Sequence, residues 1–224
     1  TPSVVLAVGT HTLTLTVTDS NGGTGSDTVT ITVMPTTGTP QVTITPARTT
    51  VNGWIAYAIE SFPANSSVTI TWKRLSGSTI DIGTGQTDAG GFATGTFRVP
   101  ATPGGPGQEI TFTSGSVSET VLFEVAPRIK VLTSPGVRGE EVNVSLRGYE
   151  RREEVRIRWR QLDGVWVEVA RVTTSNTGSA NVMVTVPAWA PDGNNSVRGD
   201  GTVFRQQTNV VFIGGGEFRP AGEE

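Results

Sequence analysis

The chain contains no cysteine, and His11 is its single histidine. Without thiols there are no disulfides, thiolate metal sites or cysteine nucleophiles, and one histidine cannot build a histidine-rich metal centre. Any histidine-dependent catalytic triad would have to use His11. No run of about 18 apolar residues is present, so we expect no membrane span. We recognise no signal peptide at Thr1 and expect an export signal, if there is one, to lie upstream.

Charge and catalytic patterns are also sparse. Charged residues make up 17% of the chain, and the formal net charge is −3. No overall basic field therefore attracts nucleic acid, and we expect no nucleic-acid partner. The acidic pairs Glu140-Glu141 and Glu153-Glu154 are adjacent, so on strands their carboxylates point to opposite faces. No glycine-rich phosphate loop opens a helix. We expect no enzymatic activity, no cofactor and no bound metal.

The residues that are abundant are those of β-structure and turns. The 224 residues include 28 Gly and 13 Pro, and no stretch of ten residues has convincing helical apolar spacing. Short alternating apolar segments are separated by clusters of Gly, Pro, Asn and Asp, which is typical of all-β sandwiches. At about 100 residues per sandwich, the length allows two sandwiches and a fraction.

The sequence contains an internal repeat with an offset of 87 residues. Val-Thr-Ile-Thr-Trp at 68–72 corresponds to Val-Arg-Ile-Arg-Trp at 155–159, and Val-Pro-Ala at 99–101 recurs at 186–188. The alignment needs no gap, so it predicts two sandwich domains, repeat 1 (40–126) and repeat 2 (127–213). Only Val125-Ala126-Pro127 joins them, and this short, Pro-stiffened connection predicts a fairly rigid rod. We expect a linker at 35–39 and a flexible tail at 214–224.

One hairpin in each repeat can be aligned from its pattern. Placing Trp159 opposite Val167 puts the apolar residues of both strands on one face and leaves Leu162-Asp163-Gly164 as a three-residue loop. The same solution, shifted by 87 residues, places Trp72 opposite Ile80. Both tryptophans are therefore predicted to lie in a core.

Residues 1–34 follow a different pattern. Apolar residues alternate with threonine along 12–18, a Gly-rich turn follows, and the alternation resumes along 28–33. The segment Val-Gly-Thr-His-Thr-Leu-Thr-Leu-Thr-Val-Thr-Asp at 8–19, with Gly22-Gly23, Asp27 and Val-Thr-Ile-Thr-Val at 29–33, resembles the end of a PKD-type Ig-like repeat. Such repeats are common in secreted and surface proteins of microbes. The two 87-residue repeats resemble, more loosely, Ig-like modules of microbial surface proteins, through their strand tryptophan and the Val-Pro-Ala that closes a strand.

This N-terminal hairpin presents one apolar face that needs a cover. An isolated hairpin is marginal in water, and each uncovered apolar side chain forgoes about 1.5–3 kcal/mol of burial. The cover could come from upstream strands of the same chain, from strands of another molecule, or from repeat 1. The face is a candidate assembly face, formed by Leu13, Leu15, Val17, Val29, Ile31 and Val33.

Arginines form the most conspicuous candidate ligand patch. Arg156, Arg158 and Arg160 share one face of a strand, beside Trp166, and could bind an anionic polysaccharide. The predicted register offers a structural alternative, because it places Glu168 opposite Arg158 and Trp166 opposite Arg160, for an ion pair and a cation–π contact. With 12 basic and 9 acidic residues, repeat 2 is only weakly basic.

Two further groups have both a binding and a structural interpretation. Trp54, Trp166 and Trp189 could stack on sugar rings, or could pack beside loops as amphipathic aromatics. Asp19, Asn21 and Asp27 carry oxygen ligands suited to Ca²⁺, but these residue types are also those that turns require.

The sequence therefore predicts an all-β rod of tandem Ig-like sandwiches with an incomplete PKD-like unit at its N-terminus. We expect it to be a non-enzymatic spacer, display stalk or self-assembling, filament-forming element of an extracellular or cell-surface microbial protein. Its partners would be neighbouring domains or copies of itself. The alternative is an accessory module that binds a carbohydrate or cell-wall polymer.

Overall fold

The computed structural model describes residues 4, 6, 9–33, 38–75, 77–132 and 137–213, with the backbone alone for 205–213. Within these residues the chain contains strands and no helix, so none of it is a membrane-spanning helix. The all-β class is confirmed. The strands are β1 (Gly9–Thr18), β2 (Thr24–Val33), β3 (Gln41–Thr45), β4 (Arg48–Thr50), β5 (Trp54–Glu60), β6 (Ser67–Lys73), β7 (Thr79–Gln86), β8 (Ala93–Arg98), β9 (Gly105–Ser114), β10 (Val117–Ala126), β11 (Arg128–Val131), β12 (Glu141–Arg147), β13 (Glu154–Arg160), β14 (Trp166–Thr173), β15 (Ala180–Thr185), β16 (Gly193–Asp200) and β17 (Arg205–Ile213).

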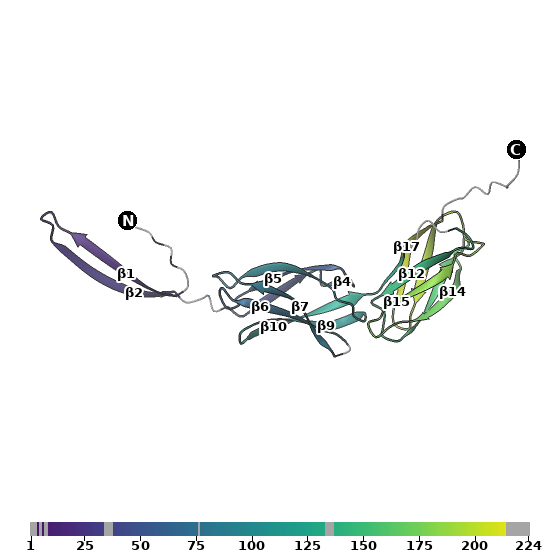
Figure 1. The fold of residues 1–224 in the computed structure, drawn as a ribbon, viewed down its shortest axis with the longest axis horizontal. Helices are drawn as coiled ribbons and strands as arrows, with labels where there is room; N and C mark the ends of the chain where they lie inside the picture. Colours follow the sequence, from purple (N-terminus) through teal and green to yellow (C-terminus); the bar gives the residue numbers. More distant parts are fainter. Residues whose placement is uncertain are drawn as a thin grey trace, which may run out of the picture.

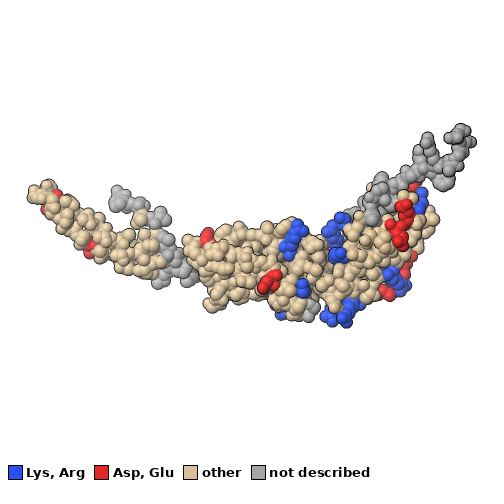
Figure 2. Space-filling model, viewed as in Figure 1, with Lys and Arg blue, Asp and Glu red and all other residues tan. Residues whose placement is uncertain are grey.

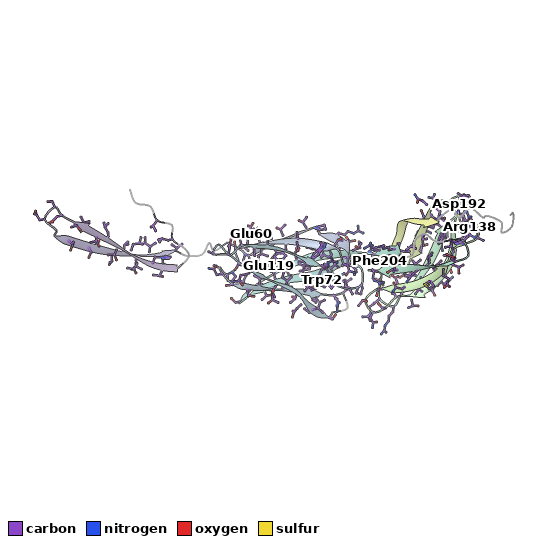
Figure 3. The ribbon with its side chains drawn as sticks, turned by 45° about the horizontal axis from the view of Figure 1, so that its top comes forward. Glu60, Trp72, Glu119, Arg138, Asp192 and Phe204 are labelled. Atoms are coloured by element: carbon purple, nitrogen blue, oxygen red, sulfur yellow. The ribbon has the colours of Figure 1, made fainter. Side chains whose placement is uncertain are left out.

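Repeat 1 is a sandwich of two sheets. One has the strand order β4–β10–β9–β6–β7 and the other has the order β3–β5–β8. Every neighbouring pair is antiparallel except β4, which runs parallel to the end of β10. Alternate side chains of the two sheets meet in one core, in which Trp72 is fully buried and packs edge-on against Phe123 at 5.3 Å between ring centroids. Figure 3 shows Trp72 inside this sandwich.

Repeat 2 has the same architecture. Its sheets have the orders β14–β13–β16–β17 and β11–β12–β15, and a second core lies between them. Each strand of repeat 2 lies 87 residues after a strand of repeat 1, as with β6 and β13 or β8 and β15. The counterpart of β4 would fall at 135–137, of which 135 and 136 lie outside the described residues. Figure 1 shows the two sandwiches end to end.

Buried polar contacts repeat as well as strands. Trp72 Nε1 donates to Gln108 Oε1 at 2.8 Å, and at the equivalent place Trp159 Nε1 donates to Asn195 Oδ1 at 2.9 Å. Both tryptophans are fully buried, so an indole N–H without a partner would cost about 1–3 kcal/mol. One buried amide in each repeat therefore fixes the core tryptophan against the neighbouring strand.

The predicted hairpin registers are confirmed. Trp159 lies opposite Val167, and Trp72 lies opposite Ile80. Gly164 and Gly77, which close the two loops, have φ of +86° and +87°, the left-handed conformation that this loop type needs.

The N-terminal hairpin consists of β1 and β2, which pair only with each other among the described residues. Leu13 lies opposite Val29 and His11 opposite Ile31, so the apolar residues share one face and threonines cover the other. In the turn, the Asp19 carboxylate accepts hydrogen bonds from the backbone N–H groups of Asn21 and Gly23, both at 2.8 Å. Asp19 thus serves the turn, and the described residues contain no group of three or more His, Cys, Asp or Glu side chains that could hold a metal ion.

Candidate functional site

The arginine face of β13 has different partners from those expected. Arg158 and Glu168 are directly opposite, as predicted, but the prediction of an ion pair between them is wrong. The Arg158 guanidinium instead lies 3.3 Å from the Asp200 carboxylate, and Glu168 accepts a hydrogen bond from Arg171 at 2.5 Å. Arg171 also lowers the pKa of the Glu168 carboxyl, through this hydrogen bond.

The expected cation–π contact also has a different donor. Trp166 lies opposite Arg160, but the guanidinium over its ring is that of Arg198, 4.4 Å from the ring centroid. Arg198 also lies 2.7 Å from Asp200, and both side chains are largely buried. The cause is β16, which pairs with the other edge of β13 and brings Arg198 and Asp200 beside the arginine row.

Within the candidate ligand patch of Arg156, Arg158, Arg160 and Trp166, Arg158 is therefore paired with Asp200, and Arg198 covers the Trp166 ring. The hollow over it, of about 280 Å³, is lined by acidic as well as basic residues. Its members are Glu154, Arg156, Arg158, Asp200, Gly201 and Thr202. The carboxylates of Glu154 and Asp200 in this lining would oppose an anionic ligand.

The tryptophans without a repeat counterpart all reach the surface. Trp54 is 56% exposed and lies beneath Arg98, whose guanidinium is 4.4 Å from the ring centroid. Trp166 is half-buried beneath Arg198, and Trp189 is 39% exposed. An arginine covers part of the ring in two of the three, which favours a structural role for Trp54 and Trp166 over sugar stacking.

The apolar hairpin face is largely open to solvent. Leu15 is 66% exposed, Val17 is 61% exposed and Val29 is 53% exposed, whereas Leu13 and Val33 are half-buried. Open apolar side chains on a two-stranded sheet form a surface that needs a partner.

The two repeats are in direct contact at their junction. Only Pro127 separates β10 from β11, and it is buried. The Gly104 N–H in repeat 1 donates to the Tyr149 carbonyl oxygen in repeat 2 at 3.0 Å. A Cβ on Gly104 would lie 1.9 Å from the carbonyl oxygen of Gly148, so the two backbones meet with no room for a side chain.

Side chains close the same junction. A Cβ at Gly105 would lie 3.2 Å from Leu75 and 3.7 Å from Phe204, so residues of both repeats meet there. Phe204 also packs against the core of repeat 2, and Figure 3 shows it at the end of repeat 2 that faces repeat 1. Sequence reasoning predicted a stiff connection from Pro127 but missed these contacts, because they come from loops distant in the sequence.

Two buried groups beside this junction hold loops in place. The buried Glu153 carboxylate accepts hydrogen bonds from the Glu150 N–H at 2.7 Å and from the Thr202 N–H and hydroxyl, both at 2.9 Å. The Tyr149 hydroxyl donates to the Gly199 carbonyl at 3.3 Å. Burial raises the pKa of Tyr149, and the negative charges of Glu153 and Asp200 raise it further. Glu153 and Tyr149 thus form their hydrogen bonds with other groups of repeat 2, which is typical of residues with a structural role.

No protein-family model and no curated protein matches the chain. Among solved structures it is similar to a tetra-tandem repeat in the extending region of a large adhesion protein, with 18% identity and a TM-score of 0.38 over 93% of this chain and 55% of that chain. It is also similar to the D0-D1 domain of intimin, with 14% identity and a TM-score of 0.31 over 77% of this chain and 97% of that one. A third is the Yersinia pseudotuberculosis adhesin InvE, with 12% identity and a TM-score of 0.36 over 78% of this chain and 58% of that one. The chain thus spans about half the length of the first structure. These scores are too low to argue from, so the sandwich assignment rests on the strand pairing and the two cores.

Proposed function

We propose that the chain is a non-enzymatic structural segment of a secreted or surface-anchored microbial protein, which holds other parts of that protein, or its adhesive surface, at a fixed separation. In this proposal the units are a PKD-like unit that ends within 1–34, a linker at 35–39, sandwiches at 40–126 and 127–213, and a tail at 214–224.

The observation that carries the proposal is the junction. Most domains joined by flexible linkers move independently, and a spacer made of them would not fix a distance. Here the Gly104–Tyr149 hydrogen bond, the contact between Gly104 and Gly148, and Phe204 at Gly105 tie the two sandwiches together. Because the two contacts of Gly104 join backbone to backbone, they favour one relative orientation of the repeats.

Force spectroscopy on a single molecule of residues 1–224 tests the two-unit structure. Pulling from the termini should give two unfolding events of nearly equal contour length, because each unit contains 87 residues and releases at most about 310 Å of extended chain. A single event, or a gradual extension without peaks, would contradict two independently cored units.

The N-terminal hairpin is the assembling part of the proposal. We expect the strands that cover its apolar face to come from polypeptide outside residues 9–33, and two sources are testable. If another copy supplies them, light scattering should show a mass well above 23.5 kDa that rises with concentration, and deletion of 1–34 should abolish the rise. If other strands of the same polypeptide supply them, this chain should stay near 23.5 kDa at all concentrations. Self-association that survives the deletion would refute assembly through the hairpin.

A further inference from the structure

A basic groove lies where repeat 2 meets repeat 1. Its volume is about 220 Å³, and it is bordered by β11 and β12 on one side and by the turn between β4 and β5 on the other. The lining residues are Val51, Asn52, Arg128, Lys130, Leu132, Ser145 and Arg147. Figure 2 shows Lys and Arg side chains gathered where the two repeats meet.

The cations in this groove are placed at a cost to the fold. Arg128 on β11 lies directly opposite Arg147 on β12, and like charges in opposed positions destabilise a sheet. Lys130 lies two residues along β11 from Arg128, on the same face. Among the residues that the structure describes, Arg128 and Lys130 form no ion pair, whereas Arg48 on β4 is bonded to Glu124 at 2.7 Å.

No acidic residue of the described part of the chain lines the groove, and the carboxylate that shares the Arg147 face of β12 is far from it. That carboxylate belongs to Glu141, six residues from Arg147. At about 3.4 Å per residue this separation is about 20 Å, well beyond one Debye length at physiological salt. Arg147 donates to the carbonyl oxygens of Leu146 and Ala180, so protein groups fix its side chain without cancelling its charge.

The fold itself does not require these cations. At the equivalent positions repeat 1 has Gln41, Thr43 and Glu60 in place of Arg128, Lys130 and Arg147. Gln41 and Glu60 face each other on β3 and β5 in the register in which Arg128 and Arg147 face each other. The same sheet therefore forms without the like-charge pair, and repeat 2 alone carries it.

We propose that this groove binds an acidic polysaccharide, through carboxylate or sulfate groups placed between Arg128, Lys130 and Arg147. Guanidinium groups bind such anions with paired, charge-assisted hydrogen bonds. The exposed Asn52 amide at the rim can bond sugar hydroxyls. No aromatic residue lines the groove, so it lacks the stacking platform on which single-stranded nucleic acid relies. The site is distinct from the candidate patch of Arg156, Arg158, Arg160 and Trp166, and it gives the proposed spacer a ligand at its junction.

The test measures binding of full-length 1–224 to heparin, to polygalacturonate, to neutral dextran and to duplex DNA of matched charge, at low and physiological salt. The test variant is Arg128→Gln/Lys130→Thr, which installs the repeat 1 residues. The matched control is Arg156→Ser/Arg160→Ser, which removes the same net charge from exposed positions of β13. Unchanged thermal transitions establish that both variants are folded.

We expect wild type to bind at least one acidic polysaccharide and not dextran. The test variant should lose about tenfold in affinity, and its salt dependence should fall by about two released counterions. The affinity of the control variant should stay within about twofold of the wild-type affinity. The proposal is overturned if wild type binds neither polysaccharide, if both variants lose polysaccharide affinity equally, or if duplex DNA binds more tightly than either polysaccharide. The spacer function is tested separately, by the distances between spin labels on the two repeats.

Discussion

Replacing Asn195 with leucine should unfold repeat 2 at a markedly lower temperature. The Asn195 side chain accepts from Trp159 Nε1 at 2.9 Å and donates to the carbonyl oxygens of Pro191 and Gly193, also at 2.9 Å. The residue is only 3% exposed, so water does not readily replace these bonds. Leucine has the same branched skeleton of four side-chain heavy atoms, and the change therefore removes hydrogen bonds without opening a cavity.

The expected loss follows from those three bonds. Each is worth about 0.5–1.5 kcal/mol, and the orphaned indole N–H adds its desolvation cost, so we expect about 2–4 kcal/mol in total. For a unit of this size each kcal/mol shifts Tm by about 4–8 °C, so a loss of about 2–4 kcal/mol lowers Tm by about 8–32 °C.

Differential scanning calorimetry of the full chain measures this shift. Gln108→Leu is the counterpart in repeat 1, since Gln108 accepts from Trp72 and donates to the Pro103 carbonyl, and it should destabilise repeat 1 instead. Asn194→Leu, at the exposed neighbouring position, should change stability by less than about 0.5 kcal/mol. If Asn195→Leu shifts the transition no more than Asn194→Leu does, then the buried amide does not hold the tryptophan and the reasoning fails.

Three further predictions concern titration and glycines. The raised pKa of Tyr149 means that folded repeat 2 keeps a proton that the unfolded chain releases near pH 10, so its unfolding free energy should fall by up to about 1.4 kcal/mol per pH unit above pH 10. Urea titrations should show this slope in wild type and lose it in Tyr149→Phe; an unchanged slope would refute it. Gly178→Ala should lower the unfolding free energy by about 2–4 kcal/mol, because its Cβ would lie 1.9 Å from the Tyr149 carbonyl oxygen. Gly193→Ala, where φ is +84° and the space is open, should lower it by only about 1 kcal/mol. Equal chemical-denaturation midpoints for the two variants would contradict this difference. Gly104→Ala should leave both sandwiches folded but separate their tumbling in NMR relaxation, and a single common correlation time would count against the junction.

The cores were predictable from the sequence because they follow from a local alternation of apolar residues that occurs in both repeats. Alternation around Trp72 and Trp159 fixes which face is buried, and two copies of one pattern fix the register twice. The turn at Asp19 was predictable for the same reason, since its hydrogen bonds reach only two and four residues along the chain.

The charged surfaces were not predictable in this way. The partners of Arg158 depend on β16, which lies about 40 residues further along the chain and whose pairing with β13 no local pattern specifies. The basic groove likewise depends on β11 meeting β12 in one register, and on the β4–β5 turn of the other repeat. Nor could the sequence reveal the junction contacts of Gly104 and Phe204, because loops from both repeats create them.

The rigidity of the junction is the central claim, and pulsed electron–electron resonance between spin labels measures it most directly. Because the chain contains no cysteine, Thr96→Cys/Met183→Cys places one label on each repeat at equivalent exposed positions of β8 and β15. A reference pair within repeat 1, Thr96→Cys/Thr69→Cys, gives the width that the labels alone produce. We predict a single distance distribution between the repeats about as narrow as the reference. A broad or multiple distribution would contradict a rigid spacer.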